Sequence, residues 1–187
     1  MALPSELHTP RLILRHWCDE DRASFAALNA DPEVMRYFPA CLDRAQSDAL
    51  VERVQRHVAE HGFGWWVLQH RDTGAFIGAA GLLHVGFAAP FVPAVEIGWR
   101  LACAHWRQGF AREAATAALA SGFQDLGLAQ IVSFTVVDNL PSQGVMQAIG
   151  MRHDPAGDFE HPALAEGHPL RRHVLYRLTR HDWEALS

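Results

Sequence analysis

The sequence predicts an α+β domain, on the basis of its length, its composition and the order of its elements. With 187 residues, of which 49% are hydrophobic and 20% charged, the chain is long enough for one well-packed domain and too short for two. Its strand and helix patterns follow the order strand, helices, three strands, helix, strand, helix and two strands. We therefore expect a single domain over residues 1–187, organised around a strand, glycine turn and helix at residues 92–122.

The first third of the chain predicts one strand and three helices. Residues 11–15 alternate charged and aliphatic side chains, as a half-buried strand does, and residues 19–29 form an amphipathic helix pattern. A helix start at residues 31–34 and a longer helix at residues 43–61 follow.

Two histidines on the longer helix have the spacing of metal ligands. His57 and His61 are four residues apart, but we expect no third ligand nearby, and their neighbours Arg53, Arg56 and Glu60 are charged. We expect a solvated helix face there and no metal site.

A hairpin and an apolar loop come next. Residues 64–70 and 75–83 read as strands joined by residues 71–74, a turn that ends in glycine. Residues 85–91 are apolar, with phenylalanines that either fold under the sheet or form a substrate rim or subunit contact.

The central unit combines an isolated carboxylate with a glycine-containing helix start. Residues 95–102 are rich in β-branched and aromatic side chains and include one carboxylate, Glu96. Residues 111–123 form an alanine-rich helix pattern. The start of such a helix leaves backbone N–H groups without carbonyl partners and attracts anions, and Gly109, Arg107 and Arg112 strengthen that tendency. The unit predicts a phosphate or pyrophosphate site; an ordinary strand-to-helix loop is the alternative.

The last third predicts a buried strand, a helix, a long connection and a closing strand. Residues 130–137 form a continuous apolar strand, and Pro141 begins a helix that runs to Ile149. Residues 154–170 form a long irregular connection, which indicates a functional loop. Residues 173–179 make the closing strand, and a short tail follows.

Charge and cysteine content exclude several functional classes. The net charge of −5 and the pI near 6.1 argue against a nucleic-acid partner. Cys18, Cys41 and Cys103 are odd in number and widely spaced, so neither a disulfide framework nor a zinc ribbon is expected, and a reducing cytoplasm fits. Because no segment has about 20 consecutive apolar residues, we expect no membrane partner.

The central unit resembles the acyl-CoA-binding motif of the GNAT N-acetyltransferase superfamily, [QR]-x-x-G-x-[GA]. Gly109 and Ala111 match its last two fixed positions, whereas Trp106 stands at the first. A tryptophan before a basic-Gly-aromatic-Ala run resembles the RimJ/RimL branch, which acetylates ribosomal-protein amino termini, and residues 9–15 resemble the opening strand of that branch. The resemblance extends from Arg11 to Thr179.

This resemblance implies the fold and the cofactor. In GNAT proteins helices flank a mixed, mostly antiparallel sheet of six to seven strands, which splays here between residues 95–102 and 131–137. Acetyl-CoA sits in the gap, with its pyrophosphate on the amides of residues 107–112, and we take the Arg100 N–H as the donor to the thioester oxygen. The cofactor-binding residues implied are Arg100, Leu101, Ala102, Arg107, Gln108, Gly109, Phe110, Ala111, Arg112, Asn139 and Ser142.

The resemblance also implies direct transfer of an acetyl group to a primary amine, either a protein or peptide N-terminus or a small molecule. Glu96 is the expected base, acting directly or through water, with Glu160 as its rival, and Ser142 is the expected proton donor. Glu96→Gln is expected to lower kcat/KM most at low pH. Asn139 and Ser142 match the second GNAT motif, although both also suit a helix cap.

Two other functions stay open on the sequence alone. A non-catalytic acyl-CoA-binding or sensing module would keep the fold without turnover. An enzyme with Cys103 as covalent acyl carrier would need His105, two residues away, as its base. The acceptor amine is not decodable by motif, and a homodimer is left open.

Overall fold

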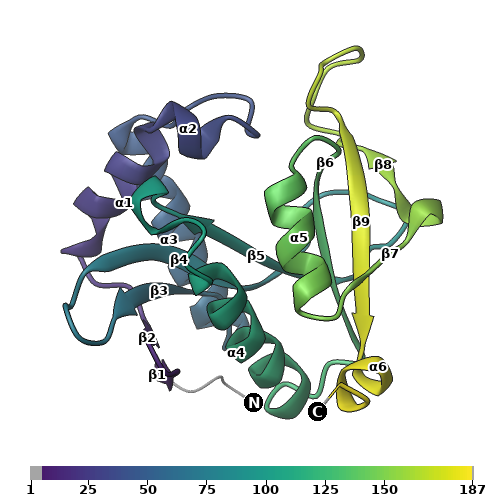
Figure 1. Cartoon of the computed structure of the whole chain (residues 1–187). Helices are drawn as coiled ribbons and strands as arrows, with labels where there is room; N and C mark the ends of the chain where they lie inside the picture. The colour runs from purple at the N-terminus through teal and green to yellow at the C-terminus, as the bar shows by residue number, and fades with distance from the viewer. Residues whose placement is uncertain (1–5, 187) are drawn as a thin grey trace.

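The computed structural model describes residues 6–186, and one nine-stranded sheet runs through this part of the chain (Figure 1). The strand order is β1-β2-β3-β4-β5-β6-β9-β7, with β8 paired to β9. The strands are β1 (Glu6–His8), β2 (Leu12–Arg15), β3 (Trp65–His70), β4 (Phe76–His84), β5 (Val95–Leu101), β6 (Gln130–Val136), β7 (Arg152–His153), β8 (Phe159–Glu160) and β9 (Arg172–Thr179).

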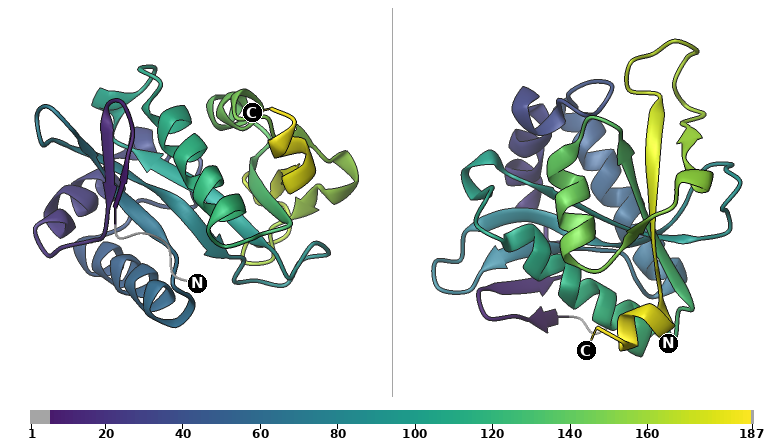
Figure 2. Two further views of the ribbon diagram at one scale, coloured as in Figure 1. Left: turned by 90° about the horizontal axis from the view of Figure 1, so that it is seen from below. Right: turned by 45° about the vertical axis from the view of Figure 1, so that its right-hand side comes forward.

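Helices cover both faces of the sheet. The α-helices are α1 (Asp21–Ala30), α2 (Pro32–Met35), α3 (Arg44–His61), α4 (Phe110–Gln124), α5 (Leu140–Ala148) and α6 (Arg180–Glu184), and the 3-10 turns are η1 (Cys103–His105) and η2 (Pro155–Gly157). Residues of α4 and α5 pack in one core cluster, and residues of α1 and α3 pack in another on the opposite face. Figure 2 shows α4 and α3 on opposite sides of the sheet. No described helix is long and apolar enough to cross a membrane.

The predicted elements and fold class are confirmed, with small shifts at the ends and three additional strands. The sheet has nine strands where six to seven were expected, because β1, β7 and β8 are only two or three residues long and carry little periodicity. The connection at residues 154–170 is not wholly irregular, since it contains η2 and β8.

The apolar loop after β4 folds against β6 and β8. The Phe87 ring lies 5.5 Å from Phe134 and 5.8 Å from Phe159 between centroids, and Phe91 lies 5.1 Å from Phe159. Packing these rings together removes apolar area from water, as the folded-under arrangement predicts. Phe87 also lines the cavity between β5 and β6, so the substrate rim stays a prediction, as does the subunit contact.

The sheet divides between β5 and β6, as expected. β4 and β5 pair continuously from Gly78 opposite Leu101 to His84 opposite Val95, but β5 and β6 share one parallel pair, Glu96 opposite Val132. Beyond it the strands diverge, and Figure 1 shows β6 and β9 turned away from β3 and β4. This divergence creates the space for a site.

Candidate active site

A cavity of about 1590 Å³ opens where β5 and β6 diverge, and α2, α3, α4 and α5 contribute to its walls. It gathers most of the residues that the sequence singled out. The expected site residues that line it are Glu96, Arg100, Leu101, Arg107, Gly109, Phe110, Ala111, Arg112, Asn139 and Ser142. Ala102 and Gln108 do not line it.

The first turn of α4 faces this cavity without a side-chain cap. Gly109 occupies the N-cap position with φ 83°, and Arg107 has φ 58°. This left-handed conformation suits glycine, which has no Cβ. Arg107 and Arg112 are exposed and form no ion pair with any residue from 6 to 186. The helix start therefore presents N–H groups and two guanidinium groups to an anion.

Arg11 fastens this loop to the beginning of the chain, a role that the sequence did not reveal. Its Nη1 donates to the Gln108 carbonyl at 2.8 Å, its Nη2 lies 2.7 Å from Glu113, and its guanidinium stacks 4.5 Å from the Phe110 centroid. Thr9 donates to the same Glu113 carboxylate at 2.7 Å. These contacts fix the position of the first turn of α4.

Trp106, which departs from the family motif, braces the loop from the other side. Its Nε1 donates to the Leu101 carbonyl at 2.8 Å, and the Gln108 side chain donates to the Ala104 carbonyl at 2.9 Å. Gln108 is thus a structural side chain, and only its main chain belongs to the turn before α4.

The main-chain donors at the open edge of β5 differ from the one expected. The Ala102 N–H donates to the Ile77 carbonyl on β4 at 3.0 Å, and the register along both strands is unbroken. Because N–H direction alternates along an antiparallel strand, the Arg100 N–H also faces β4. The N–H groups of Trp99 and Leu101 face the gap instead, so the choice of the Arg100 N–H is wrong.

Glu96 lies in the cavity wall and has no hydrogen bond or ion pair with any residue that the structure describes. Burial raises its pKa to about 7, and the nearby charge of Arg53 offsets only part of that shift. A carboxyl group of this kind exchanges its proton near neutral pH. The rival base Glu160 lies outside the cavity wall and near Arg171 and Arg172, at 3.4 and 3.8 Å.

Asn139 and Ser142 combine the two roles that the sequence left open. Asn139 caps α5 by accepting from the Ser142 N–H at 3.3 Å, and its Nδ2 donates to the hydroxyls of Thr135 at 2.9 Å and Ser142 at 3.1 Å. Both residues also line the cavity. Because the Ser142 hydroxyl accepts from Asn139, its own proton is free to be donated.

Of the two tyrosines, one lines the cavity and was missed. Tyr37 follows α2 and belongs to the cavity wall. Tyr176 is 3% exposed and its hydroxyl bonds to Gln143 and Gln147 at 3.2 and 3.3 Å. No local motif marks Tyr37; only the packing of α2 against α1 brings it to the site.

The surroundings of Cys103 do not favour a covalent role. Burial and the carboxylate of Asp31 raise the pKa of the thiol, so the reactive thiolate is less available than in a free cysteine. Burial and the charge of His70 lower the pKa of His105.

The histidine pair on α3 has a third member that the sequence did not suggest. His84 of β4 joins His57 and His61, with one ring nitrogen of each within 4.8 Å of the others. The main chain engages both His57 nitrogens: Nδ1 lies 2.7 Å from the Phe63 carbonyl and Nε2 accepts from the His84 N–H at 3.0 Å. The expectation that no third ligand is nearby is wrong, while the absence of a metal stays a prediction.

Comparison with known proteins identifies the family. The sequence pattern of the Acetyltransferase (GNAT) domain matches residues 11–152. The chain belongs to the GNAT acetyltransferase family. The RimJ/RimL branch within it stays a prediction.

Individual relatives resemble most of this chain. It is 32% identical to the uncharacterized protein YkkB of Bacillus subtilis (strain 168), over 82% of this chain and 88% of the relative. It is 30% identical to the FsC-acetyl coenzyme A-N(2)-transacetylase of Aspergillus fumigatus, over 95% of this chain and 77% of that protein. The crystal structure of the acetyltransferase from Agrobacterium tumefaciens str. C58 has a TM-score of 0.76 at 26% identity and covers 95% of both chains. With further relatives named as N-acetyltransferases, this chain is an N-acetyltransferase.

Proposed function

We propose that this GNAT enzyme transfers the acetyl group of acetyl-CoA directly to a primary amine in the cavity between β5 and β6. One observation carries the proposal: an unpaired carboxylate with a pKa of about 7, Glu96, shares a cavity with the uncapped start of α4. A cofactor held at the start of α4 and an amine held near Glu96 would lie in the same cavity. Bringing the two reactants together is the main requirement of acyl transfer.

The start of α4 suits the diphosphate of acetyl-CoA. The N–H groups of residues 110–112 would bind its oxygens, and Arg107 and Arg112 would balance its charge. Gly109 leaves the approach open, because even an added Cβ would meet only the Arg11 side chain, at 3.3 Å. Gln108 and Ala102 would contribute through their main chains alone. The open edge of β5 and the Asn139 side chain would bind the amide-containing arm of the cofactor.

The chemistry needs a neutral amine, and Glu96 would take up its proton. At pH 7 an α-amino group needs about 1 kcal/mol to lose its proton, whereas a lysine needs about 4–5 kcal/mol. A carboxylate with a pKa of about 7 is matched to the first of these tasks and is half ionised at neutral pH.

The remaining steps fall to main-chain groups of β5 and to hydroxyl groups in the cavity wall. The amine nitrogen forms a bond to the thioester carbon, and the N–H of Trp99 or Leu101 would stabilise the negative charge on the carbonyl oxygen. The carbon–sulfur bond then breaks, and the thiolate takes a proton from Ser142 or, as a second candidate, Tyr37. The nitrogen, which carries an extra proton after the attack, gives that proton up to the same hydroxyl through water, so the donor is restored and Glu96 keeps the first proton. The products are an N-acetyl amine and free CoA.

Calorimetry with acetyl-CoA, followed by thiol-release assays over a panel of primary amines, tests this function. We expect heat on binding, amine-dependent thiol release, intersecting initial-rate plots and normal rates in Cys103→Ala. Binding without thiol release from any amine would favour the non-catalytic module. Parallel plots, with loss of activity in Cys103→Ala, would favour a covalent carrier.

A further inference from the structure

The cavity contains a buried arginine that has no acidic partner. Arg100 is 9% exposed and forms no ion pair among residues 6–186. Its Nη1 donates to Asn29 Oδ1 at 2.6 Å, its guanidinium lies 4.2 Å from the Phe38 centroid, and its Nε has no hydrogen-bond partner. Burying a charge is costly unless it is paired, so an unpaired one in a cavity wall calls for a ligand.

The free edge of Arg100 is the one that grips carboxylates. With Nη1 engaged by Asn29, the Nε and Nη2 groups are left, and these two lie side by side on the guanidinium. Two parallel N–H groups match the two oxygens of a carboxylate.

Two further donors lie in the same part of the cavity wall. Arg53 of α3 is exposed, lines the cavity and has no ion pair with any described residue. Burial lowers the pKa of Arg100 to about 10, and the positive charge of Arg53 acts in the same direction. The Trp65 Nε1 is buried without a hydrogen-bond partner.

The acids of the cavity wall do not offset these cations. Of its two carboxylates, Glu33 lies 3.5 Å from Arg36, and Glu96 has a pKa of about 7, so it is partly neutral at neutral pH. The cations also lie apart from the diphosphate position, because Arg53 belongs to α3 and the side chain of Arg100 contacts Asn29 of α1. They therefore belong to the acceptor side.

The spacing along β5 relates these cations to the base. Glu96 and Arg100 point to the same face, with Cα atoms about 13 Å apart in an extended strand. Gly98 lies between them, and the Trp65 ring covers it so closely that an added Cβ would lie 2.9 Å from the ring. A small molecule lying along this face would have one end near each charged group.

We propose that the acceptor is a small amine that also carries a carboxylate, with its nitrogen toward Glu96 and its carboxylate held by Arg100, Arg53 and the Trp65 N–H. This inference rests on the proposed function and names its substrate class. It excludes polyamines, because a second ammonium group would face two unpaired guanidinium groups.

Matched pairs of acceptors test the proposal. γ-Aminobutyrate and β-alanine are compared with butylamine and propylamine, which have similar amino groups and no carboxylate, and with phosphoethanolamine and spermidine. We expect kcat/KM to be at least about 10-fold higher for the carboxylate-bearing member of each pair, since hydrogen bonds between charged groups are stronger than those between neutral ones. A preference for a carboxylate-free amine, for spermidine or for phosphoethanolamine would overturn the proposal.

Variants then assign the preference to these residues. Arg53→Gln and Arg100→Gln should each reduce the carboxylate preference about 10-fold, with the KM for acetyl-CoA unchanged, and Arg100→Lys should restore part of it. Arg56→Gln, on the same helix but outside the cavity wall, is the matched control and should leave the preference intact. Because Arg53 is exposed, its variant tests the proposal even if Arg100→Gln fails to fold.

The proposed acceptor class and the proposed acetyltransferase function can fail separately. If acetyl-CoA binds and carboxylate-free amines are acetylated while none of the carboxylate-bearing amines is, the acceptor class is wrong and the acetyltransferase function stands. If the carboxylate preference survives both Gln variants, its assignment to Arg53 and Arg100 is wrong. If calorimetry detects no acetyl-CoA binding, the proposed function itself fails.

Discussion

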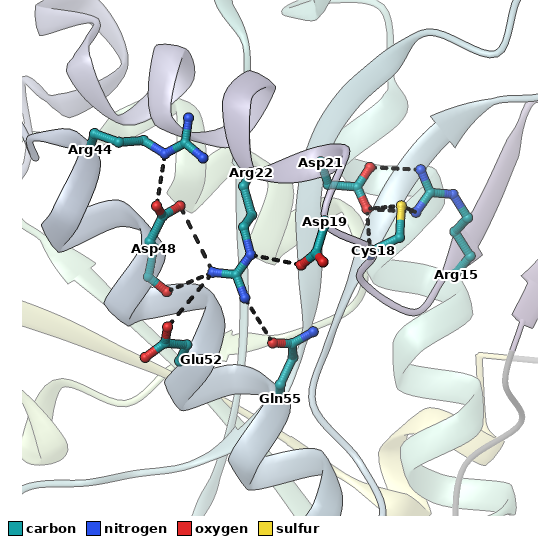
Figure 3. Close-up of polar contacts among 9 residues, drawn as sticks. All are labelled: Arg15, Cys18, Asp19, Asp21, Arg22, Arg44, Asp48, Glu52 and Gln55. Atoms are coloured by element: carbon teal, nitrogen blue, oxygen red, sulfur yellow. Dashed lines mark hydrogen bonds and ion pairs between the residues drawn. The ribbon is translucent and has the colours of Figure 1, made fainter.

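The charged residues around α1 and α3 that Figure 3 draws, here called the α1–α3 cluster, are paired, whereas several in the wall of the cavity are not. In the α1–α3 cluster every guanidinium meets a carboxylate: Arg15 lies 2.7 Å from Asp21, and Arg44 lies 2.8 Å from Asp48. Arg22, between them, lies 3.1 Å from Asp19. In the cavity wall, Arg53, Arg100 and Glu96 have no ion pair within the described chain.

The starts of α3 and α4 also differ, because side chains cap the first and not the second. α3 begins with a capping box, in which Asp43 accepts from the Gln46 N–H at 2.8 Å and Gln46 accepts from the Asp43 N–H at 2.9 Å. α4 begins at Gly109 with no side-chain cap. In this comparison the chain pairs its charges and N–H groups internally in one region and leaves them unpaired around the cavity, which favours a ligand there. An unpaired group alone does not mark a site, since α1 also begins without a side-chain cap and Arg56 has no ion pair among the described residues.

The largest expected effect comes from Glu96→Gln, which removes the proposed base. Removing a general base costs about 10²–10⁴-fold in rate, so kcat/KM at pH 8 should fall about 10²-fold or more. With its pKa at about 7, Glu96 is ionised mainly above pH 7, and the loss should shrink at pH 6. This reverses the pH dependence expected from the sequence. pH–rate profiles check it, with Glu160→Gln, outside the cavity wall, as the control.

The same substitution should raise the stability of the fold at pH 8, although it lowers activity there. Because the folded-state pKa of Glu96, about 7, exceeds the ordinary value of 4.5, ionisation destabilises the fold as pH rises through this range. At pH 8 Glu96→Gln should therefore melt at a higher temperature than the wild type, with a gain of at most about 3 kcal/mol in unfolding free energy. At pH 4 the variant and the wild type should melt at the same temperature. Equal melting at both pH values would contradict the raised pKa.

Asp21→Asn should do the reverse, lowering stability and sparing catalysis. Burial acts to raise the pKa of Asp21, but hydrogen bonds from Arg15 and Cys18 outweigh it and hold the pKa below its ordinary value of 3.8. The pair therefore stabilises the fold above that pH and ceases to do so as pH falls through the lowered pKa. We expect a loss of about 3 kcal/mol at pH 7, measured by urea unfolding, with kcat/KM unchanged at a temperature where the variant is folded.

Gly109→Val should weaken acetyl-CoA binding about 10- to 100-fold. A β-branched residue at φ 83° would distort the turn that presents the N–H groups of α4. Gly74→Val is the control, because Gly74 has a similar φ of 71° in a hairpin turn away from the cavity wall. Calorimetry should show normal affinity in the control; equal losses in both variants would remove the diphosphate assignment.

Arg44→Ala should have the smallest effect, at most about 0.5 kcal/mol in unfolding free energy. Its ion pair with Asp48 is an exposed pair one helical turn apart, with 59% of the Arg44 side chain accessible. A larger loss in urea unfolding would mean that the α1–α3 cluster acts as one cooperative network.

Residue types alone predicted the parts of the site that lie close together in the sequence. Glu96 stands out as an acid in an apolar strand, and Gly109 with its flanking arginines marks a helix start, so both were recognisable without a structure. The direction of the β5 amides was not, because it depends on the register with β4, which no local pattern specifies.

Residues that reach the site through long-range packing escaped prediction for the same reason. The sequence places Arg53 on a solvated helix face and gives no role to His84, which follows the predicted strand at residues 75–83, but the fold brings both to the cavity wall. Arg100 was assigned a main-chain role, whereas its buried side chain, which contacts Asn29 at 2.6 Å, is the more informative feature.

Gly98 also bears on how acceptor choice changes within such a family. A single methyl group at this position would push the Trp65 indole outward, since the added Cβ would lie only 2.9 Å from the ring. One codon change could therefore reshape the room available to an acceptor while every reacting group keeps its place. Selectivity and chemistry can thus evolve independently in this enzyme.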